Sequence, residues 1–406
     1  MDRDFSQALL VEGGKMMTIA ALEERGADLR PAIEDNLLLF WRRLNERGYA
    51  RGEILRTLSD RDRGLGPSRL GEIAALASGS GMPFEDLLAY NLYEDTVFQE
   101  GCTVMAALGS TSASGNPILL KNSDKVGGKS LTGPNFHLNK EINVILDGRS
   151  ESGHRIMAVA AAGSTGIKMG MNDAGVITGS NIGRTLELKE KKADLTTLRA
   201  LDRGQIMRDG LEFDNAHAAA DAVLSQLIRN PMSTPGNVEF LDKKECYIIE
   251  GSYTRFAVDI VRGDRVAARA NHFILLHALN DPADIAGHKR YARCLELLNA
   301  NAGQIDRRKM IDFSCDHANG PGPNSICRHG KTPEEETSLS AMVMELEPER
   351  PKKSLVTIAM GKPCHAWRDP EGHVTLSMDC KPEEIPQPFL NGEVWKRLYT
   401  EEPRAA

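Results

Sequence analysis

The first hundred residues carry apolar side chains at helical spacing. Between Met16 and Arg47, leucine, isoleucine and tryptophan side chains recur every three or four positions, which predicts one long or broken amphipathic helix. The run Gly64-Leu-Gly-Pro67 interrupts this pattern, which resumes from Leu70 to Ala77. Pro83 suits the first turn of another helix, which should continue to about Glu94. The chain is therefore predicted to begin with a helical segment.

From residue 102 onward the pattern changes to short apolar runs between Gly, Ser, Thr, Asn and Asp residues, which predicts strands. These runs are Thr103–Leu108, Pro117–Leu120, Ile142–Leu146, Ile156–Ala161, Ile167–Met171, Val176–Thr178, Val238–Leu241, Cys246–Glu250, Phe256–Val261, Val266–Ala270, Leu339–Glu345, Leu355–Met360 and His373–Met378. The first two runs predict a hairpin, and the two that flank residues 242–245 predict another. Helical patterns return at about 196–228 and 287–313. Many strands with helical insertions predict an α+β protein with helices packed on sheets.

Composition narrows the class of protein. Of the 406 residues, 41% are hydrophobic and 26% are charged, with a net charge of −7, which argues against nucleic acid or an anionic membrane as a partner. The N-terminus has mixed charge without an apolar core, and no stretch of 18 apolar residues occurs, so neither a signal peptide nor a membrane helix is expected. Seven cysteines without CxxC spacing argue against a disulfide scaffold or a zinc site, and a cytoplasmic location is expected.

No metal and no cofactor are expected either. The ten histidines include no HExxH pattern. The segment Gly127-Gly-Lys-Ser130 resembles the end of a Walker A loop, but Ser123 stands where its first glycine is required. Cys364 and His365 are adjacent, and adjacent side chains on a strand point to opposite faces, which is a poor arrangement for a catalytic dyad.

The bond between Gly101 and Cys102 lies where the helical segment ends and the strands begin. Glycine tolerates the strained backbone that attack by a neighbouring thiol on its carbonyl requires. An N-to-S acyl shift followed by hydrolysis would make Cys102 a new N-terminus, whose α-amine has a pKa of about 7.7–8.0. That amine can act as the general base for its own thiol, and no histidine is needed. On spacing alone, a buried structural cysteine is the favoured interpretation, and self-cleavage is the alternative.

Six motifs in sequence order resemble the acyl-coenzyme A:isopenicillin N acyltransferase family, the autoproteolytic C45 enzymes. They span about residues 85 to 330. They are Leu87-Leu-Ala-Tyr-Asn-Leu-Tyr-Glu94, Glu100-Gly-Cys-Thr103, Leu120-Lys-Asn-Ser-Asp124, Gly166-Ile-Lys-Met-Gly-Met-Asn-Asp-Ala-Gly-Val176 leading to Asn181, Ala270-Asn-His272 and Asn324-Ser-Ile-Cys-Arg328. Ser123 departs from the family's bulky aromatic residue at that position, which puts the shape of the pocket in doubt.

The resemblance implies a four-layer αββα N-terminal-nucleophile (Ntn) hydrolase fold. Residues 1–101 would form a helical leader and residues 102–406 the catalytic chain. Self-cleavage would leave the two as a heterodimer that forms one composite domain, with room for a higher homo-oligomer. The implied activity is a cysteine amidohydrolase that acts on a small N-acyl compound or non-peptide amide through a thioester on Cys102.

The resemblance also implies roles for individual residues. Cys102 would be the nucleophile for self-cleavage and for turnover. Asn271 would supply an amide N–H to the oxyanion, or it satisfies loop backbone. Asp124 would hold the α-ammonium group or polarise the thiol, or it forms an Asx-turn. Ser325 and Arg328 would line the substrate site, where Arg328 either binds a substrate carboxylate or makes a structural ion pair.

Two other functions remain open at this point. An acyltransferase would form the same thioester and pass the acyl group to an amine. A catalytically inactive scaffold on the same fold would keep an intact chain. The sequence shows no phosphate cradle for coenzyme A, which favours hydrolysis.

Overall fold

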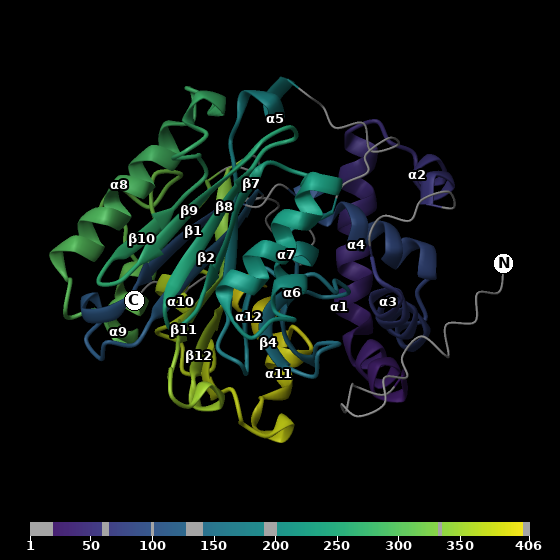
Figure 1. Ribbon diagram of the computed structural model, residues 1–406. Coiled ribbons are helices and arrows are strands. Elements are labelled where there is room, and N and C mark those ends of the chain that lie inside the picture. Colours follow the sequence, from purple (N-terminus) through teal and green to yellow (C-terminus); the bar gives the residue numbers. More distant parts are fainter. Residues whose placement is uncertain are drawn as a thin grey trace.

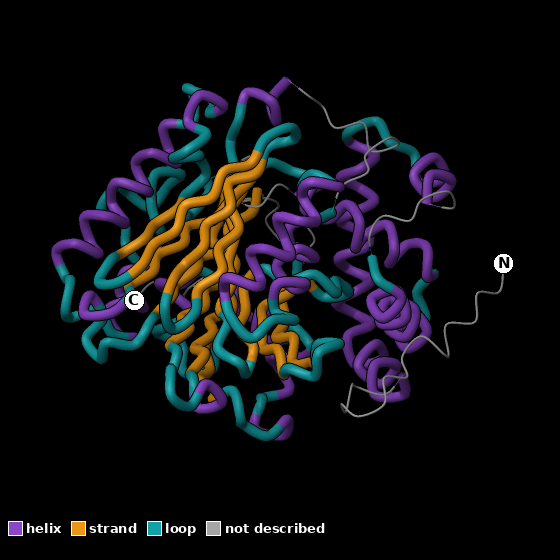
Figure 2. Tube along the Cα trace, in the orientation of Figure 1, coloured by secondary structure: helices purple, strands orange, loops and turns teal. Residues whose placement is uncertain are grey.

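Two antiparallel sheets stack face to face at the centre of the protein, and helices cover both outer faces (Figures 1 and 2). The computed structural model describes residues 19–58, 65–98, 101–126, 141–190, 201–331 and 335–400. Glu100 and the Walker-like segment 127–130 lie outside these ranges. The predicted α+β class and the four-layer αββα order are confirmed by this arrangement.

The first sheet has six strands in the order β10-β1-β2-β11-β12-β13. Their bounds are β1 Gly101–Ala107, β2 Ile118–Val126, β10 Val266–Arg269, β11 Glu336–Glu345, β12 Leu355–Met360 and β13 His373–Ser377. The predicted hairpin is formed by β1 and β2, and its register pairs Gly101 with Asp124 and Cys102 with Ser123. β1 also pairs with β10, and β2 also pairs with β11, so both strands have a neighbour on each side and lie inside the sheet.

The second sheet has seven strands in sequence order, β3 to β9. Their bounds are β3 Asn143–Arg149, β4 Arg155–Ala161, β5 Met169–Asn172, β6 Ile177–Ile182, β7 Gly236–Leu241, β8 Glu245–Gly251 and β9 Phe256–Arg262. The second predicted hairpin is formed by β7 and β8. Each strand pairs with the next along the chain, so this sheet is a simple meander that the helical insertion between β6 and β7 interrupts.

The outer layers come from the predicted helical insertions and from the C-terminus. The helices α8 (Ile285–Ala300) and α9 (Arg307–Ser314) cover the first sheet, and α6 (Arg203–Gly210) and α7 (Ala216–Arg229) cover the second. Outside the N-terminal segment, four short helices were not predicted; they are α5 Leu186–Glu190, α10 Pro363–Ala366, α11 Gln387–Leu390 and α12 Glu393–Thr400. Turns of 3-10 helix occur at Gly109–Thr111, His277–Leu279, Pro351–Lys353 and Pro382–Glu384.

The N-terminal segment is helical, as predicted. Its helices are α1 Ile19–Glu46, α2 Arg51–Leu58, α3 Pro67–Ser80 and α4 Phe84–Phe98. They lie beside the second sheet, to the right of the strands in Figure 1. Asn36 of α1 donates to the carbonyls of Ile142 and Ala162 at 3.2 and 3.0 Å, which fixes α1 to the β3–β4 edge of that sheet.

Alternation along β1 explains the two cores. Val104 and Ala106 belong to the large core that joins the two sheets and the N-terminal helices, whereas Met105 and Ala107 belong to a smaller core with α8 and α9. Successive strand side chains point to opposite faces, so Cys102 shares the face of Val104 and Thr103 shares that of Met105.

Buried charges join the N-terminal helices to the sheets. Glu94 of α4 forms an ion pair with Lys125 of β2, and Lys125 also pairs with Glu141. Lys168 lies 3.4 Å from Glu94 and 3.2 Å from Glu141. Two lysines thus share two carboxylates in a buried cluster, and breaking such a pair on one side costs about 3–5 kcal/mol.

Glu239 on β7 should make the stability of the protein depend on pH. Burial is the main influence on its carboxyl group, and it raises the pKa of Glu239 from 4.5 to about 8, against the opposing charges of Arg269 and Lys121. Between about pH 5 and pH 8 the Glu239 carboxyl group keeps its proton in the folded protein and releases it in the unfolded chain. The stabilising contribution is therefore present below the unfolded pKa and is lost as pH rises, by on the order of 3–5 kcal/mol in all.

Urea unfolding of wild type and Glu239→Gln at several pH values measures this contribution. We expect the stability difference between Glu239→Gln and wild type to shift in favour of the variant as pH rises from about 5 to 8. Glu349→Gln, at an exposed position, is the control and should follow wild type. A constant difference between Glu239→Gln and wild type across this range would contradict the prediction.

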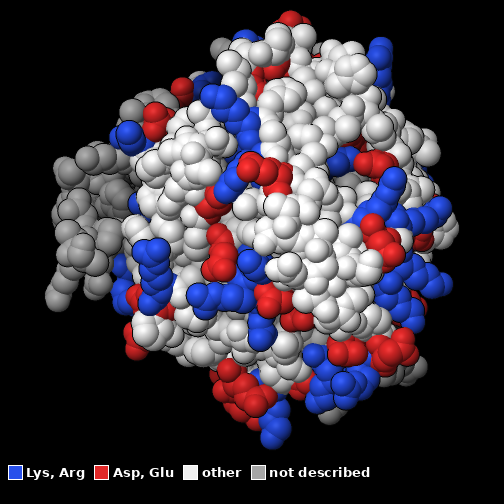
Figure 3. All heavy atoms as spheres, turned by 90° about the vertical axis from the view of Figure 1, so that its left-hand side faces the viewer, with Lys and Arg blue, Asp and Glu red and all other residues white. Residues whose placement is uncertain are grey.

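The face covered by α8 carries both kinds of charge (Figure 3). Lysine and arginine side chains are interspersed with aspartate and glutamate there, and no large region has one sign. Within the described ranges, none of the helices combines the length and the apolar character needed to span a membrane.

Candidate active site

Strand ends from both sheets bring the predicted residues to one end of the molecule. Cys102 lies at the start of β1, and Asp124 lies near the end of β2 beside it. Asn181 is near the end of β6, and Asn271 follows β10. Because neighbouring strands run antiparallel, the start of one strand lies beside the end of the next, and these residues meet at one end of the strands.

Cys102 is buried, with 1% of its surface exposed. Its carbonyl oxygen accepts a hydrogen bond from Arg290 Nη1 at 2.9 Å and another from Asn181 Nδ2 at 3.5 Å. Asn181 Nδ2 also donates to the carbonyl of Arg269 at 3.2 Å. The backbone of the candidate nucleophile is therefore held by polar side chains from two other elements.

Arg290 of α8 connects the candidate nucleophile to Asn271. Its Nη1 also donates to Thr103 Oγ1 at 2.9 Å, and its Nη2 donates to Asn271 Oδ1. Asn271 Nδ2 in turn donates to the carbonyl of Ile182 at 3.0 Å. One guanidinium group thus fixes both the start of β1 and the orientation of the Asn271 amide.

The ends of two charged side chains lie close to the Gly101 backbone. A Cβ atom built at this position would lie 2.6 Å from Glu336 Oε1 and 2.8 Å from Arg328 Nη1. Arg328 and Glu336 form an ion pair with each other, and Glu336 also pairs with Arg184. Real Cβ atoms essentially never approach so closely, so a side chain at this position would require the ends of Glu336 and Arg328 to move.

Asp124 lies on the other side of this ion pair. Its Oδ1 accepts a hydrogen bond from Ser338 Oγ at 2.6 Å, and its Oδ2 is 3.8 Å from Arg328 Nη1. Ser338 and Arg328 are also joined, because the Arg328 backbone N–H donates to Ser338 Oγ at 2.9 Å. Asp124 is therefore tied to the loop that carries Arg328, next to the Gly101 backbone.

Three arginines place positive charge around Cys102. Burial lowers the pKa of Arg184 and of Arg290, and the charge of a Cys102 thiolate works in the opposite direction on both. Burial likewise lowers the pKa of Arg328 to about 9, with Arg290 adding to the decrease and Asp124 opposing it, so Arg328 remains a cation at neutral pH. Nearby cations favour the thiolate form of a cysteine.

Ser325 is placed differently from the other predicted residues. It is buried, and its hydroxyl group donates to the carbonyl of Gly320 within the same loop. Gly101, Cys102, Asp124, Asn271 and Arg328 come together, whereas no contact of Ser325 with them is seen among the described residues. Sequence reasoning missed Arg184, Arg290 and Glu336, which belong to no motif and are recognised only by their contacts.

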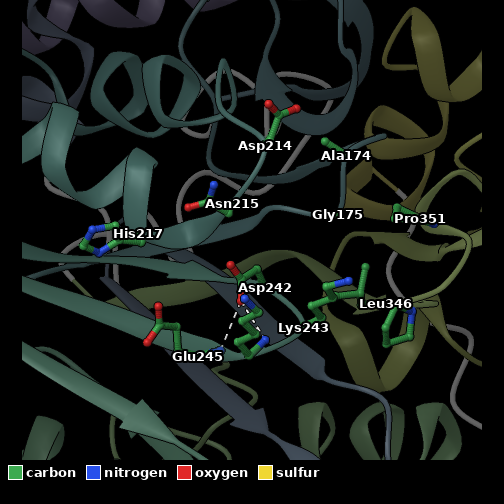
Figure 4. Close-up of a pocket in the computed structure, with 12 residues that line it drawn as sticks. Ala174, Gly175, Asp214, Asn215, His217, Asp242, Lys243, Glu245, Leu346 and Pro351 are labelled. Atoms are coloured by element: carbon green, nitrogen blue, oxygen red, sulfur yellow. Dashed lines mark hydrogen bonds between the residues drawn. The ribbon is translucent and has the colours of Figure 1, made fainter.

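A surface hollow of about 440 Å³ lies at the opposite end of the strands (Figure 4). The Asp242–Glu245 turn forms one side of it, and Leu346 and Pro351 form another. Leu346 follows the end of β11 that pairs with Ile118, whereas Cys102 pairs with Ser123 at the other end of β2. Five residues of strand separate these ends by about 17 Å. The hollow is therefore not an entrance to Cys102.

Comparisons with known proteins add little to this geometry. No family profile matches the sequence, and no curated protein matches it. Among solved structures, an N-acylethanolamine-hydrolyzing acid amidase ortholog from Caenorhabditis elegans covers 60% of this chain and 92% of its own, with 13% identity and a TM-score of 0.38.

Two further structures resemble the protein to a similar degree. Penicillin V acylase from Agrobacterium tumefaciens covers 64% of this chain and 83% of its own, with 12% identity and a TM-score of 0.39. A mutant form of conjugated bile acid hydrolase from Clostridium perfringens covers 70% of this chain and 94% of its own, with 9% identity and a TM-score of 0.42.

Proposed function

We propose that this protein is an autoproteolytic cysteine amidohydrolase of the N-terminal-nucleophile type. It acts on a small N-acyl compound or other non-peptide amide through a thioester on Cys102. One observation carries the proposal: Arg290 joins the carbonyl of Cys102 to the amide of Asn271, next to the Gly101 backbone.

Self-cleavage begins at the Gly101 carbonyl. The Cys102 thiolate attacks the carbonyl carbon, the C–N bond between the two residues breaks, and the nitrogen leaves as the α-amine of Cys102 after taking up a proton. Water then hydrolyses the resulting thioester, which releases a carboxylate on Gly101 and regenerates the thiol. The absence of a side chain on Gly101 supports this step, because a glycine carbonyl is open to attack and its backbone tolerates strain.

Turnover repeats the same chemistry on an external amide. The freed α-amine takes the thiol proton, the thiolate forms a thioester with the acyl group, and the amine product leaves with that proton. The side-chain amide nitrogen of asparagine carries two hydrogens. Asn271 Nδ2 donates one hydrogen bond among the described residues, to Ile182, which leaves its second N–H for the oxyanion. Such a donor contributes about 3–4 kcal/mol to the transition state.

Purified wild-type protein tests both steps. We expect denaturing electrophoresis to resolve the 44.5 kDa chain into fragments of roughly 11 and 33 kDa, in proportion to a cut after residue 101 of 406. N-terminal sequencing of the larger fragment should begin Cys-Thr-Val-Met. Acid quenching during a screen of N-acyl amides, followed by peptide mass spectrometry, should trap an acyl group on Cys102.

The same experiment separates the competing functions. An intact chain without thiol acylation would overturn the proposal and would favour a non-catalytic scaffold. A competing amine added during turnover identifies transfer, because the acyl group then appears on that amine rather than as a free acid. Free acid as the main product supports hydrolysis.

A further inference from the structure

Four side chains outside the candidate active site converge on one point. They are His317, Cys327, His329 and Cys364, and the nitrogen or sulfur atom that each offers lies within 4.8 Å of the other three. They come from three separate segments. His317 follows α9, Cys327 and His329 belong to the loop before β11, and Cys364 is in α10. Two of the four are buried and two are half-buried.

Hydrogen bonding alone does not explain the cluster. His329 Nε2 lies 3.2 Å from His317 Nε2, 3.6 Å from Cys327 Sγ and 3.1 Å from Cys364 Sγ. An imidazole nitrogen carries either one hydrogen or one lone pair, so it can serve only one of these three neighbours. Ligands around a metal ion, in contrast, all direct their lone pairs toward a common centre.

The separations from His329 are close to those around a tetrahedral ion. With zinc–nitrogen bonds of about 2.0 Å and zinc–sulfur bonds of about 2.3 Å, the corners of a tetrahedron lie about 3.3–3.8 Å apart. The three separations measured from His329 Nε2 lie close to this range. Two thiolates with two imidazoles are a donor set that zinc prefers over magnesium, calcium or manganese, which take oxygen ligands.

We propose that His317, Cys327, His329 and Cys364 bind a zinc ion in a closed, four-coordinate structural site. All four ligands come from the protein, so no position remains for a catalytic water, unlike the open site of a zinc hydrolase. From the sequence we expected no metal, because the cysteines and histidines match no known spacing of metal ligands along the chain. That spacing does not reveal a site whose ligands come from three segments.

The position of the cluster suggests what the ion would do. Cys327 and His329 flank Arg328, whose guanidinium group pairs with Glu336 beside Gly101. An ion bound by both residues would hold the backbone on each side of Arg328 and so limit its movement. Trp367 of the segment after α10 donates to Ser314 Oγ of α9 at 2.7 Å, so the contributing segments are already packed together.

Metal analysis of the full-length protein tests the site without relying on activity. After equilibration with zinc and removal of free metal, we expect elemental analysis to find about one zinc ion per chain. Cobalt-substituted protein should show the strong visible bands of tetrahedral cobalt and a sulfur-to-cobalt charge-transfer band. A zinc content below about one-tenth of an ion per chain in wild type would overturn the proposal. A Cys327–Cys364 disulfide found by mass spectrometry would also overturn it.

Single substitutions locate the ion. Cys364→Ser and His317→Gln should lose bound zinc and the cobalt–thiolate band. Cys315→Ser is the matched control, because Cys315 is a nearby free cysteine outside the cluster, and this variant should keep the metal. If the two ligand variants kept as much zinc as Cys315→Ser, the ion would lie elsewhere. The wild-type measurement decides the question even if a ligand variant fails to fold.

Discussion

Cys102→Ala should remain a single 44.5 kDa chain and should show no amide hydrolysis above background. The substitution removes the one sulfur atom to which the proposal assigns both the attack on Gly101 and the attack on substrate. Removal of a nucleophile that acts with its base as a unit lowers turnover on the order of 10⁴-fold or more. Electrophoresis over several days and a product assay measure the two losses separately.

Two other variants make this result interpretable. Cys294→Ala removes another buried cysteine, whose thiol pKa is raised to about 12 by burial, and it should cleave and turn over like wild type. Cys102→Ser keeps a weaker nucleophile at the same place and should cleave slowly. Retention of full amidase activity by Cys102→Ala would refute the assignment of the nucleophile.

Arg290→Met should cause the second largest loss. It removes the guanidinium group that binds the Cys102 carbonyl, the Thr103 hydroxyl and the Asn271 amide, and it leaves those three groups without this donor. Truncating one partner in a buried polar network of this kind lowers the free energy of unfolding by about 3–5 kcal/mol. We expect self-cleavage to slow by about two orders of magnitude, since loss of one donor at an oxyanion site costs about 10²–10³ in rate.

The pH–rate profile separates the role of Arg290 at the site from a general effect on folding. Loss of a cation beside Cys102 disfavours the thiolate, so the acid limb of the cleavage rate should move to higher pH. Lys289→Met is the control, because it removes a positive charge from the adjacent, exposed position of α8. If the acid limb of the pH–rate profile stayed in place in Arg290→Met while thermal stability fell, Arg290 would have only a structural role.

The sequence pattern predicted most of the fold because each element has its own periodicity. Alternation along residues 103–108 and 117–120 indicated the β1–β2 hairpin, and the structure extends the second strand to Val126. That extension contains Lys121, Ser123 and Lys125, which a hydrophobicity pattern assigns to the surface. The two lysines are buried because their ammonium groups have partners: Lys121 donates to the carbonyl of Lys168, and Lys125 pairs with Glu94 and Glu141.

The candidate site was predicted only in part, for a similar reason. Cys102, Asp124, Asn271 and Arg328 belong to motifs that can be read along the chain. Arg290 belongs to an amphipathic helix in which an arginine normally points to solvent, and its burial results from the packing of α8 on β1. The roles of the predicted residues stay predictions, although their proximity is now described.

The buried cluster that joins Glu94 to Lys125, Glu141 and Lys168 determines how the proposed enzyme can mature. Glu94 precedes the cut, and its three partners follow it. A gene that began at Cys102 would encode two buried lysines with only one of their two carboxylates. If the proposed cut takes place, we expect the N-terminal segment to stay bound as a subunit rather than to leave as a propeptide, and we expect the chain to fold before it is cut.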